Sequence, residues 1–209
     1  FTLYQSEEDK PSVNDNTVFT IYKDRKGVLW LGTRSGGLNS YNPKSGQYAH
    51  YLYEADNPNS ISNNAIRSIY EDRSGRLWIG TEVGLNLFNR TSKKFYRYYN
   101  QPADPTMTNV FSILEDKAGF LWIGNWGGGL SRFDPNTGKF ITYEPEADNL
   151  LSINNNIIWC MLEDQYNQLW IGTDQGGLNK YDRTNDCFFH YTHNSKDSTS
   201  LSDNKLSLI

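Results

Sequence analysis

The sequence predicts an all-β fold, and three observations support this. Aromatic residues make up 14% of the 209 residues, glycine occurs 17 times, and methionine occurs only twice. Tyrosine and tryptophan favour strands, and glycine favours the tight turns between strands. Long segments also lack the apolar period of an amphipathic helix. Short strands joined by turns are therefore expected along the whole chain.

A nine-residue phrase, Asp-x-x-Gly-x-Leu-Trp-Ile/Leu-Gly, occurs four times, at residues 24–32, 72–80, 116–124 and 164–172. Its tryptophans are spaced by 48, 44 and 48 residues, which indicates a tandem repeat of about 47 residues. Only the fourth copy departs from the phrase, with Asn167 in place of glycine. Because asparagine is the residue that best replaces glycine at a positive φ, the exception predicts a left-handed turn residue at this position.

Each repeat is expected to form four strands. The first strand is an apolar alternation at residues 18–22, 66–70, 110–114 and 158–162. The aspartate and glycine of the phrase then turn the chain into the second strand, which contains the tryptophan. A glycine-rich turn leads to the third strand, and the fourth strand is aromatic, at residues 48–53, 95–99, 140–143 and 188–191.

A four-stranded sheet of this kind has apolar side chains on both faces, so it must stack on copies of itself. Radial stacking predicts an all-β, β-propeller segment of four-stranded antiparallel blades, with four complete repeat units and partial units at both ends. The whole chain, 1–209, is expected to be one such segment, with units at approximately 1–47, 48–94, 95–139, 140–187 and 188–209. The tryptophans of the phrase should fill the spaces between blades; they are Trp30, Trp78, Trp122 and Trp170.

The repeat resembles the two-component regulator propeller repeat. The segment that carries the resemblance nearly letter for letter is Ser68-Ile69-Tyr70-Glu71-Asp72-Arg73-Ser74-Gly75-Arg76-Leu77-Trp78-Ile79-Gly80-Thr81. Such repeats form the periplasmic sensor region of hybrid two-component histidine kinases. The resemblance therefore implies a periplasmic module that recognises an oligosaccharide or polysaccharide fragment and relays a signal to a kinase outside this chain.

The ends and the charge of the chain bear on its partners. Residues 1–4 are interpreted as an outer strand and residues 206–209 as a first strand, as expected of a piece of a longer protein. Such a segment either keeps open edges or completes a ring with a second copy, so self-association as a homodimer is expected. The net charge of −4 argues against a nucleic-acid partner, and the absence of an apolar stretch of about 20 residues argues against membrane insertion.

Candidate binding residues lie where the repeat is broken. Asn125 and Trp126 stand where the other repeats have Thr33-Arg34, Thr81-Glu82 and Thr173-Asp174. A tryptophan on a glycine-flanked turn is suited to stack on a sugar ring, while polar neighbours bond its hydroxyl groups. The candidate polar partners on neighbouring turns are Arg34, Glu82, Asp174 and Gln175, and Trp159 is a weaker aromatic candidate. The alternative is that Trp126 covers an adjacent blade or joins a protein contact.

No catalytic or metal site is expected, and no cofactor. His50 and His190 occupy equivalent outer-strand positions of different repeats, and one acidic residue per hairpin is too few for a calcium site. Cys160 and Cys187 are expected to be small packed side chains rather than a disulfide. Two other functions remain open: a propeller that binds protein, and a polysaccharide-active enzyme with carboxylates converging from several blades.

Overall fold

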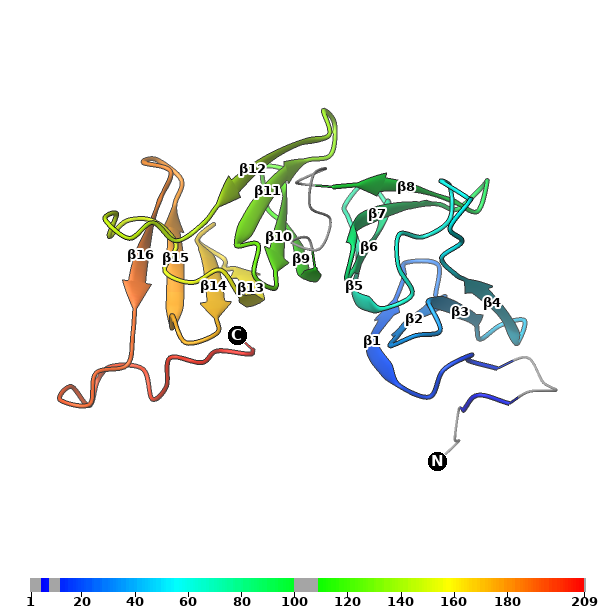
Figure 1. Cartoon of the computed structure of the whole chain (residues 1–209), viewed down its shortest axis with the longest axis horizontal. Helices are drawn as coiled ribbons and strands as arrows, with labels where there is room; N and C mark the ends of the chain where they lie inside the picture. The colour runs from blue at the N-terminus through cyan, green and yellow to red at the C-terminus, as the bar shows by residue number, and fades with distance from the viewer. Residues whose placement is uncertain (1–4, 8–11, 100–108, 209) are drawn as a thin grey trace. The chain divides into compact units, whose positions relative to one another are not determined.

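A computed structural model of the chain describes residues 5–7, 12–99 and 109–208. In this part the chain forms sixteen strands and no helix, which confirms the all-β prediction (Figure 1). The strands form four antiparallel sheets of four, each in chain order, as predicted for the repeats. The chain divides into two compact units, residues 1–99 and 100–209, and each unit contains two of the sheets.

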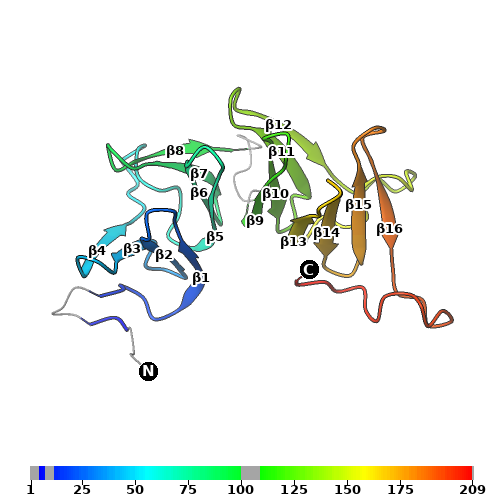
Figure 2. The same cartoon turned by 180° about the vertical axis from the view of Figure 1, so that it is seen from behind.

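The first unit holds the sheets β1–β4 and β5–β8. Their bounds are β1 (Val18–Lys23), β2 (Leu29–Thr33), β3 (Leu38–Asn42), β4 (Gln47–Tyr51), β5 (Ile66–Glu71), β6 (Leu77–Thr81), β7 (Gly84–Asn89) and β8 (Lys94–Tyr98). Strand β1 lies beside β5, so the first strands of the two sheets face each other (Figure 2).

The second unit repeats this arrangement with the sheets β9–β12 and β13–β16. Their bounds are β9 (Val110–Glu115), β10 (Leu121–Asn125), β11 (Leu130–Asp134), β12 (Lys139–Tyr143), β13 (Ile158–Glu163), β14 (Leu169–Thr173), β15 (Leu178–Asp182) and β16 (Cys187–Tyr191). Here β9 lies beside β13 (Figure 2).

The predicted fourth strand at residues 48–53 was too long at its end. Strand β4 stops at Tyr51, because Tyr51 pairs with Leu38, the first residue of β3. Beyond that point Leu52 and Tyr53 have no partner strand, and both are exposed. The prediction was too long because the apolar pattern continues beyond Tyr51, the last residue that has a partner on β3.

The aspartate of the repeated phrase organises the hairpin between the first and second strands. Asp24 Oδ1 accepts the backbone N–H groups of Lys26 at 3.0 Å and Val28 at 2.9 Å, while Oδ2 accepts the indole N–H of Trp30 at 2.9 Å. The same carboxylate–indole bond recurs in the other repeats, from Trp78 to Asp72, Trp122 to Asp116 and Trp170 to Asp164. The phrase therefore encodes a turn and a fixed indole orientation together.

The tryptophans anchor the packing between the two sheets of each unit. Trp30 packs in a buried cluster with residues of the next sheet, among them Ile66, Leu77 and Phe88. Trp122 packs in the second unit against Ile158, Leu169 and Tyr181, which hold the equivalent register positions. Trp170 in the last sheet is only partly buried, because no further sheet covers it within the described residues.

One arginine links the two sheets of each unit. Arg90 donates to Asp24 Oδ2 at 2.6 Å and to Glu71 Oε1 at 2.9 Å, so one guanidinium joins the hairpins of both sheets of the first unit. Arg183 makes the same pair of bonds in the second unit, with Asp116 and Glu163, both at 2.8 Å. Asp24, Glu71, Asp116 and Glu163 thus belong to ion-pair networks that join the sheets.

The predicted strands at the two chain ends have different outcomes. Residues 1–4 lie outside the described residues. The described residues 201–208 contain no strand, so the prediction of a first strand at 206–209 was wrong for residues 206–208. Leu206 nevertheless lies over Gly172, as Ile66 lies over Gly32, and its N–H bonds to Thr173 O at 3.0 Å. Only the hydrogen-bonded pairing with a neighbouring strand is missing, because the described residues contain no second strand of a fifth unit.

Candidate functional site

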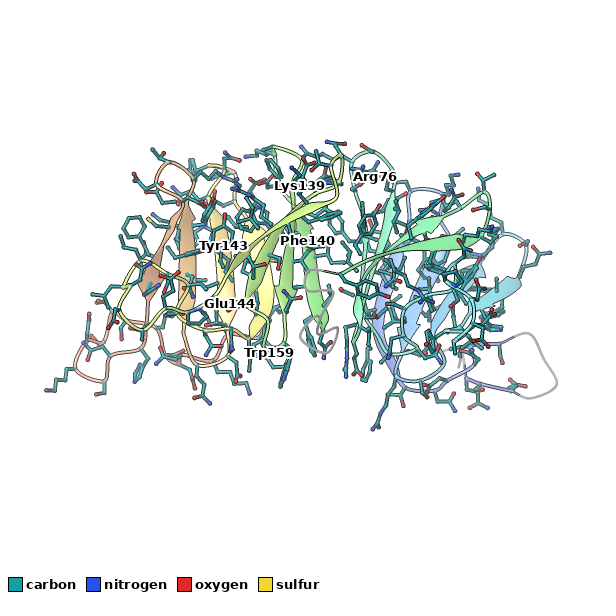
Figure 3. All side chains as sticks on the ribbon, turned by 45° about the horizontal axis from the view of Figure 1, so that its top comes forward. Arg76, Lys139, Phe140, Tyr143, Glu144 and Trp159 are labelled. Carbon is teal, nitrogen blue, oxygen red and sulfur yellow. The ribbon has the colours of Figure 1, made fainter. Side chains whose placement is uncertain are left out.

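Trp126 lies at the turn between β10 and β11, at one end of the second unit. Its N–H bonds to Asn109 O at 2.9 Å, and its backbone forms a single bridge with Ile157, which fixes the turn against the connection to β13. Figure 3 shows Trp159 at the same end of the unit as Glu144, the residue that follows β12. Lys139, where β12 begins, lies at the opposite end. Trp126 remains 43% exposed despite this fixed backbone.

Three aromatic rings meet at this end. Trp126 lies 5.3 Å from Phe111 at an interplanar angle of 33°, and 4.9 Å from Trp159 at 85°. Phe111 and Trp159 complete the triangle at 5.3 Å and 86°. Ring separations of 4.5–7 Å with offset or edge-to-face geometry are favourable, so the cluster supports Trp126 from behind while part of its surface stays accessible.

A charged pair borders the aromatic cluster. Asp174 Oδ1 accepts the indole N–H of Trp159 at 3.2 Å and lies 3.3 Å from the ammonium of Lys205. The same ammonium lies 5.9 Å from the centre of the Trp159 ring. The hydrogen bond from Trp159, followed by the interaction with Lys205, holds the pKa of the Asp174 carboxyl below its ordinary value. Asp174 is therefore a carboxylate at neutral pH, able to accept hydrogen bonds from hydroxyl groups.

Asn125 serves the turn itself. Its side chain is buried, and its amide donates to Gly129 O at 3.1 Å and to Ser131 Oγ at 3.4 Å. The equivalent Thr33 and Thr173 likewise donate to the carbonyl oxygens of their own turns. In this arrangement Asn125 positions Trp126 and presents no polar group to the accessible surface.

Gln175 is exposed beside Asp174, in the turn between β14 and β15. Its φ is +75°, a left-handed conformation that costs energy for a residue with a Cβ atom. The equivalent residue in the turn of Trp126 is Gly127, with a φ of +91°. The unusual backbone places the Gln175 side chain outward, at the same end as the aromatic cluster.

Arg34 and Glu82 belong to the first unit. Glu82 forms an ion pair with Arg67, whose guanidinium lies 4.2 Å from the centre of the Phe19 ring. Arg34 is exposed on the turn between β2 and β3. The structure thus joins Trp126, Trp159 and Asp174, with Gln175 adjacent, in the second unit, whereas Arg34 and Glu82 belong to the first unit.

Two members of the aromatic site were missed by sequence reasoning. Phe111 holds the same register position in its strand as Trp159, and this equivalence was the available signal for it. Lys205 follows the last full repeat, at the position of Ile157, and nothing in the repeat pattern marked it.

Titratable groups elsewhere in the described chain make structural contacts. His50 Nδ1 lies 2.7 Å from Asn39 Oδ1, and His190 Nε2 lies 2.7 Å from Ser152 O. Within residues 5–7, 12–99 and 109–208, no three His, Cys, Asp or Glu side chains gather as they would around a metal ion. Cys160 and Cys187 are free thiols. The same part of the chain has no helix with the length and apolar character to span a bilayer.

Four segments of the chain match the family model described as two component regulator propeller: residues 12–35, 60–83, 105–127 and 152–175. Each match ends in or near the turn that follows a second strand, so the repeat unit recognised in the sequence is the one that builds each sheet. No curated protein matches the chain.

Solved structures give the same result. The extracellular domain of the putative hybrid two component system BT3049 from B. thetaiotaomicron is 26% identical, with a TM-score of 0.74 over 96% of this chain and 27% of that chain. The corresponding domain of BT4673 from the same organism is also 26% identical, with a TM-score of 0.75 over 97% of this chain and 25% of that one. The present chain spans about a quarter of the length of these two domains.

Virginiamycin B lyase from Staphylococcus aureus is 14% identical, with a TM-score of 0.65 over 86% of this chain and 56% of that chain, and shares the fold alone. Four-stranded sheets built from one repeated unit, together with these neighbours, define the chain as a β-propeller segment. The chain belongs to the two component regulator propeller family.

Proposed function

We propose that this chain is part of an extracytoplasmic, periplasmic sensor of a two-component system, that it binds an oligosaccharide, and that the signal passes to a kinase outside the chain. Two similar structures, BT3049 and BT4673, are described as extracellular domains of putative hybrid two component systems, which supports this location and role. The family shown by the four repeats supports the same role.

The accessible indole of Trp126 is the observation that carries the ligand proposal. A sugar ring has an apolar C–H face that stacks on an aromatic surface, and hydroxyl groups that need polar partners. Phe111 and Trp159 hold the Trp126 ring in place, and Asp174 and Lys205 supply an acceptor and a donor beside it. The second unit therefore combines a stacking surface with the polar groups that a sugar requires.

Calorimetry with a panel of oligosaccharides tests this proposal by comparing the native chain with Trp126→Ala. Loss of one stacked aromatic is expected to weaken binding by about 1–3 kcal/mol, which corresponds to about 5- to 150-fold in Kd. Tyr166→Ala is the matched control, because Tyr166 is an exposed aromatic on the hairpin at the other end of β13 and β14. Equal binding by Trp126→Ala and the native chain would remove this site.

The alternative function is a propeller that binds protein without a small ligand. A flat aromatic surface such as Trp126 also suits a protein contact, and a failure of every oligosaccharide to bind would favour this alternative.

A polysaccharide-active enzyme is the least supported function. Binding without turnover of the oligosaccharide would exclude it.

The same proposal includes self-association. Ile21 is 65% exposed on β1, whereas Ile69 at the equivalent place on β5 is 7% exposed within the core. An apolar position without its usual cover favours contact with another copy. Sedimentation that shows only monomer at all concentrations would remove this part of the proposal.

A further inference from the structure

A groove of about 570 Å³ lies between the two sheets of the first unit. One wall comes from β2, β3 and β4, and the other from β7 and the turn after it. Six of its lining residues are Lys26, Trp30, Ser40, Tyr51, Phe88 and Lys93. This volume falls in the range of about 300–1,000 Å³ that is typical of small-molecule sites.

The equivalent place in the second unit is filled by an arginine. Ser40 pairs with Trp30 in the first unit, and at the same register Arg132 pairs with Trp122 in the second. The guanidinium of Arg132 donates to the hydroxyl of Tyr181 at 3.0 Å and lies 5.3 Å from the Phe120 ring. Serine is too short to reach across, so the space occupied by Arg132 in one unit is left hollow in the other.

The opposite wall of the groove, formed by β7 and the turn after it, also differs from its counterpart in the second unit. In the second unit Asp186 accepts hydrogen bonds from Tyr143 at 2.7 Å and Tyr181 at 2.5 Å, which closes the space with a polar network. In the first unit the residues equivalent to Tyr181 and Asp186 are Phe88 and Lys93, and the Lys93 ammonium lies 5.8 Å from the Phe88 ring. The hydroxyl group and the anion of this wall are replaced by an apolar ring and a cation.

The charge at the groove is unbalanced. The guanidinium of Arg90 is already neutralised by Asp24 and Glu71. Lys26 and Lys93 are exposed, and neither makes an ion pair with another residue in the part of the chain that the structure describes. The groove is thus lined by aromatic residues and by two lysines that have no ion-pair partner among the described residues.

We propose that this groove binds an aromatic carboxylate. The planar ring would take the place of the Arg132 guanidinium, which lies 5.8 Å from the Trp122 ring in the second unit. There it would contact Trp30 and the partly buried Tyr51 with the offset or edge-to-face geometry that aromatic rings favour. The carboxylate would face the ammonium groups of Lys26 and Lys93. The groove residues belong to the first unit and Trp126 to the second, and the proposal does not depend on an oligosaccharide ligand.

Calorimetry with 2-naphthoate and the neutral 2-naphthamide tests the proposal. The native chain should bind 2-naphthoate about tenfold more tightly, since two partly exposed ion pairs contribute up to about 1 kcal/mol each. Ser40→Arg should abolish binding, because it introduces the side chain that fills this place in the second unit. Lys93→Asp, which introduces the residue type of Asp186, should remove most of the preference for the carboxylate.

Two controls show whether binding takes place in the groove. Thermal unfolding establishes that each variant is folded; if Ser40→Arg is not, Ser40→Lys replaces it, because Lys180 holds this register position in the last sheet. Trp126→Ala should bind 2-naphthoate as the native chain does. Equal affinity for the acid and the amide, undisturbed binding in folded Ser40→Arg, dependence on Trp126, or no binding at millimolar 2-naphthoate would each overturn the proposal.

Discussion

Asn167 and Gln175, in two turns of the last sheet, have a left-handed backbone although neither is glycine. Asn167 has a φ of +65°, where Gly27 in the first repeat has +84°, and this confirms the left-handed turn predicted from the sequence. Gln175 has a φ of +75° without the short polar side chain that makes asparagine tolerant of this region. The strain at Gln175 therefore lies in a turn at the same end as the aromatic cluster, consistent with strained residues gathering at functional sites.

Gln175→Gly is expected to raise the free energy of unfolding by about 1 kcal/mol, because glycine removes the Cβ clash of the left-handed region at a smaller entropic cost. Chemical denaturation measures the change. The matched control is Gln165→Gly in the preceding hairpin, where φ is not positive and glycine is expected to destabilise by about 0.5–1 kcal/mol. A loss of stability in Gln175→Gly would contradict the presence of strain in this turn.

At the scale of strands and sheets, local pattern predicted most of what is observed. The apolar alternation of 158–162 predicts β13 to within one residue, and the Asp-x-x-Gly hairpin was expected from its turn chemistry. The arginine contacts were not predictable in this way. Arg183 reaches Asp116 across 67 residues, and in alternate repeats a proline such as Pro135 holds the same place as the arginine.

Part of the candidate site was likewise predictable from the sequence. Trp126 was identified as a break in the repeat, Asp174 as the residue that holds the same position in the next repeat, and Trp159 as an unusual aromatic residue in a first strand. Their contact depends on how β9 and β13 pack side by side, which no strand pattern contains. The burial of Asn125 depends in turn on the carbonyl oxygen of Gly129, four residues away across the turn.

The contact between the two sheets of the second unit gives a prediction about pH. Burial by itself raises the pKa of Asp116, but hydrogen bonds from Trp122, Arg183 and the Phe120 backbone outweigh it and hold the pKa below its ordinary 3.8. A carboxyl whose pKa is depressed in the folded state stabilises the fold at any pH above its pKa in the unfolded state. This contribution to the free energy of unfolding is lost as the pH falls through its pKa in the folded state. Asp116→Asn should therefore cost about 1–3 kcal/mol at neutral pH and flatten the loss of stability below about pH 4.

Urea denaturation at a series of pH values measures this effect. Asp148→Asn is the control, since Asp148 is an exposed carboxylate on the connection between β12 and β13. The control should leave both the neutral stability and its acid dependence nearly unchanged. An Asp116→Asn protein as stable as the native chain at neutral pH would show that the ion pair with Arg183 does not hold the sheets together.

At the scale of the whole molecule, the six tryptophans fall into two groups. Four belong to the repeated phrase, and each donates its indole N–H to the aspartate six residues before it. The other two, Trp126 and Trp159, interrupt the repeat and meet at one end of the second unit. Repetition therefore builds the sheets, and departure from repetition builds the candidate site.

The most direct measurement is a nuclear magnetic resonance titration of the six indole N–H signals with an oligosaccharide that binds. We expect the signals of Trp126 and Trp159 to shift with increasing ligand, while the four signals of Trp30, Trp78, Trp122 and Trp170 remain in place because their N–H groups stay bonded to aspartate. Shifts confined to those four signals, or unchanged Trp126 and Trp159 signals at saturation, would contradict a sugar site built on the break in the repeat.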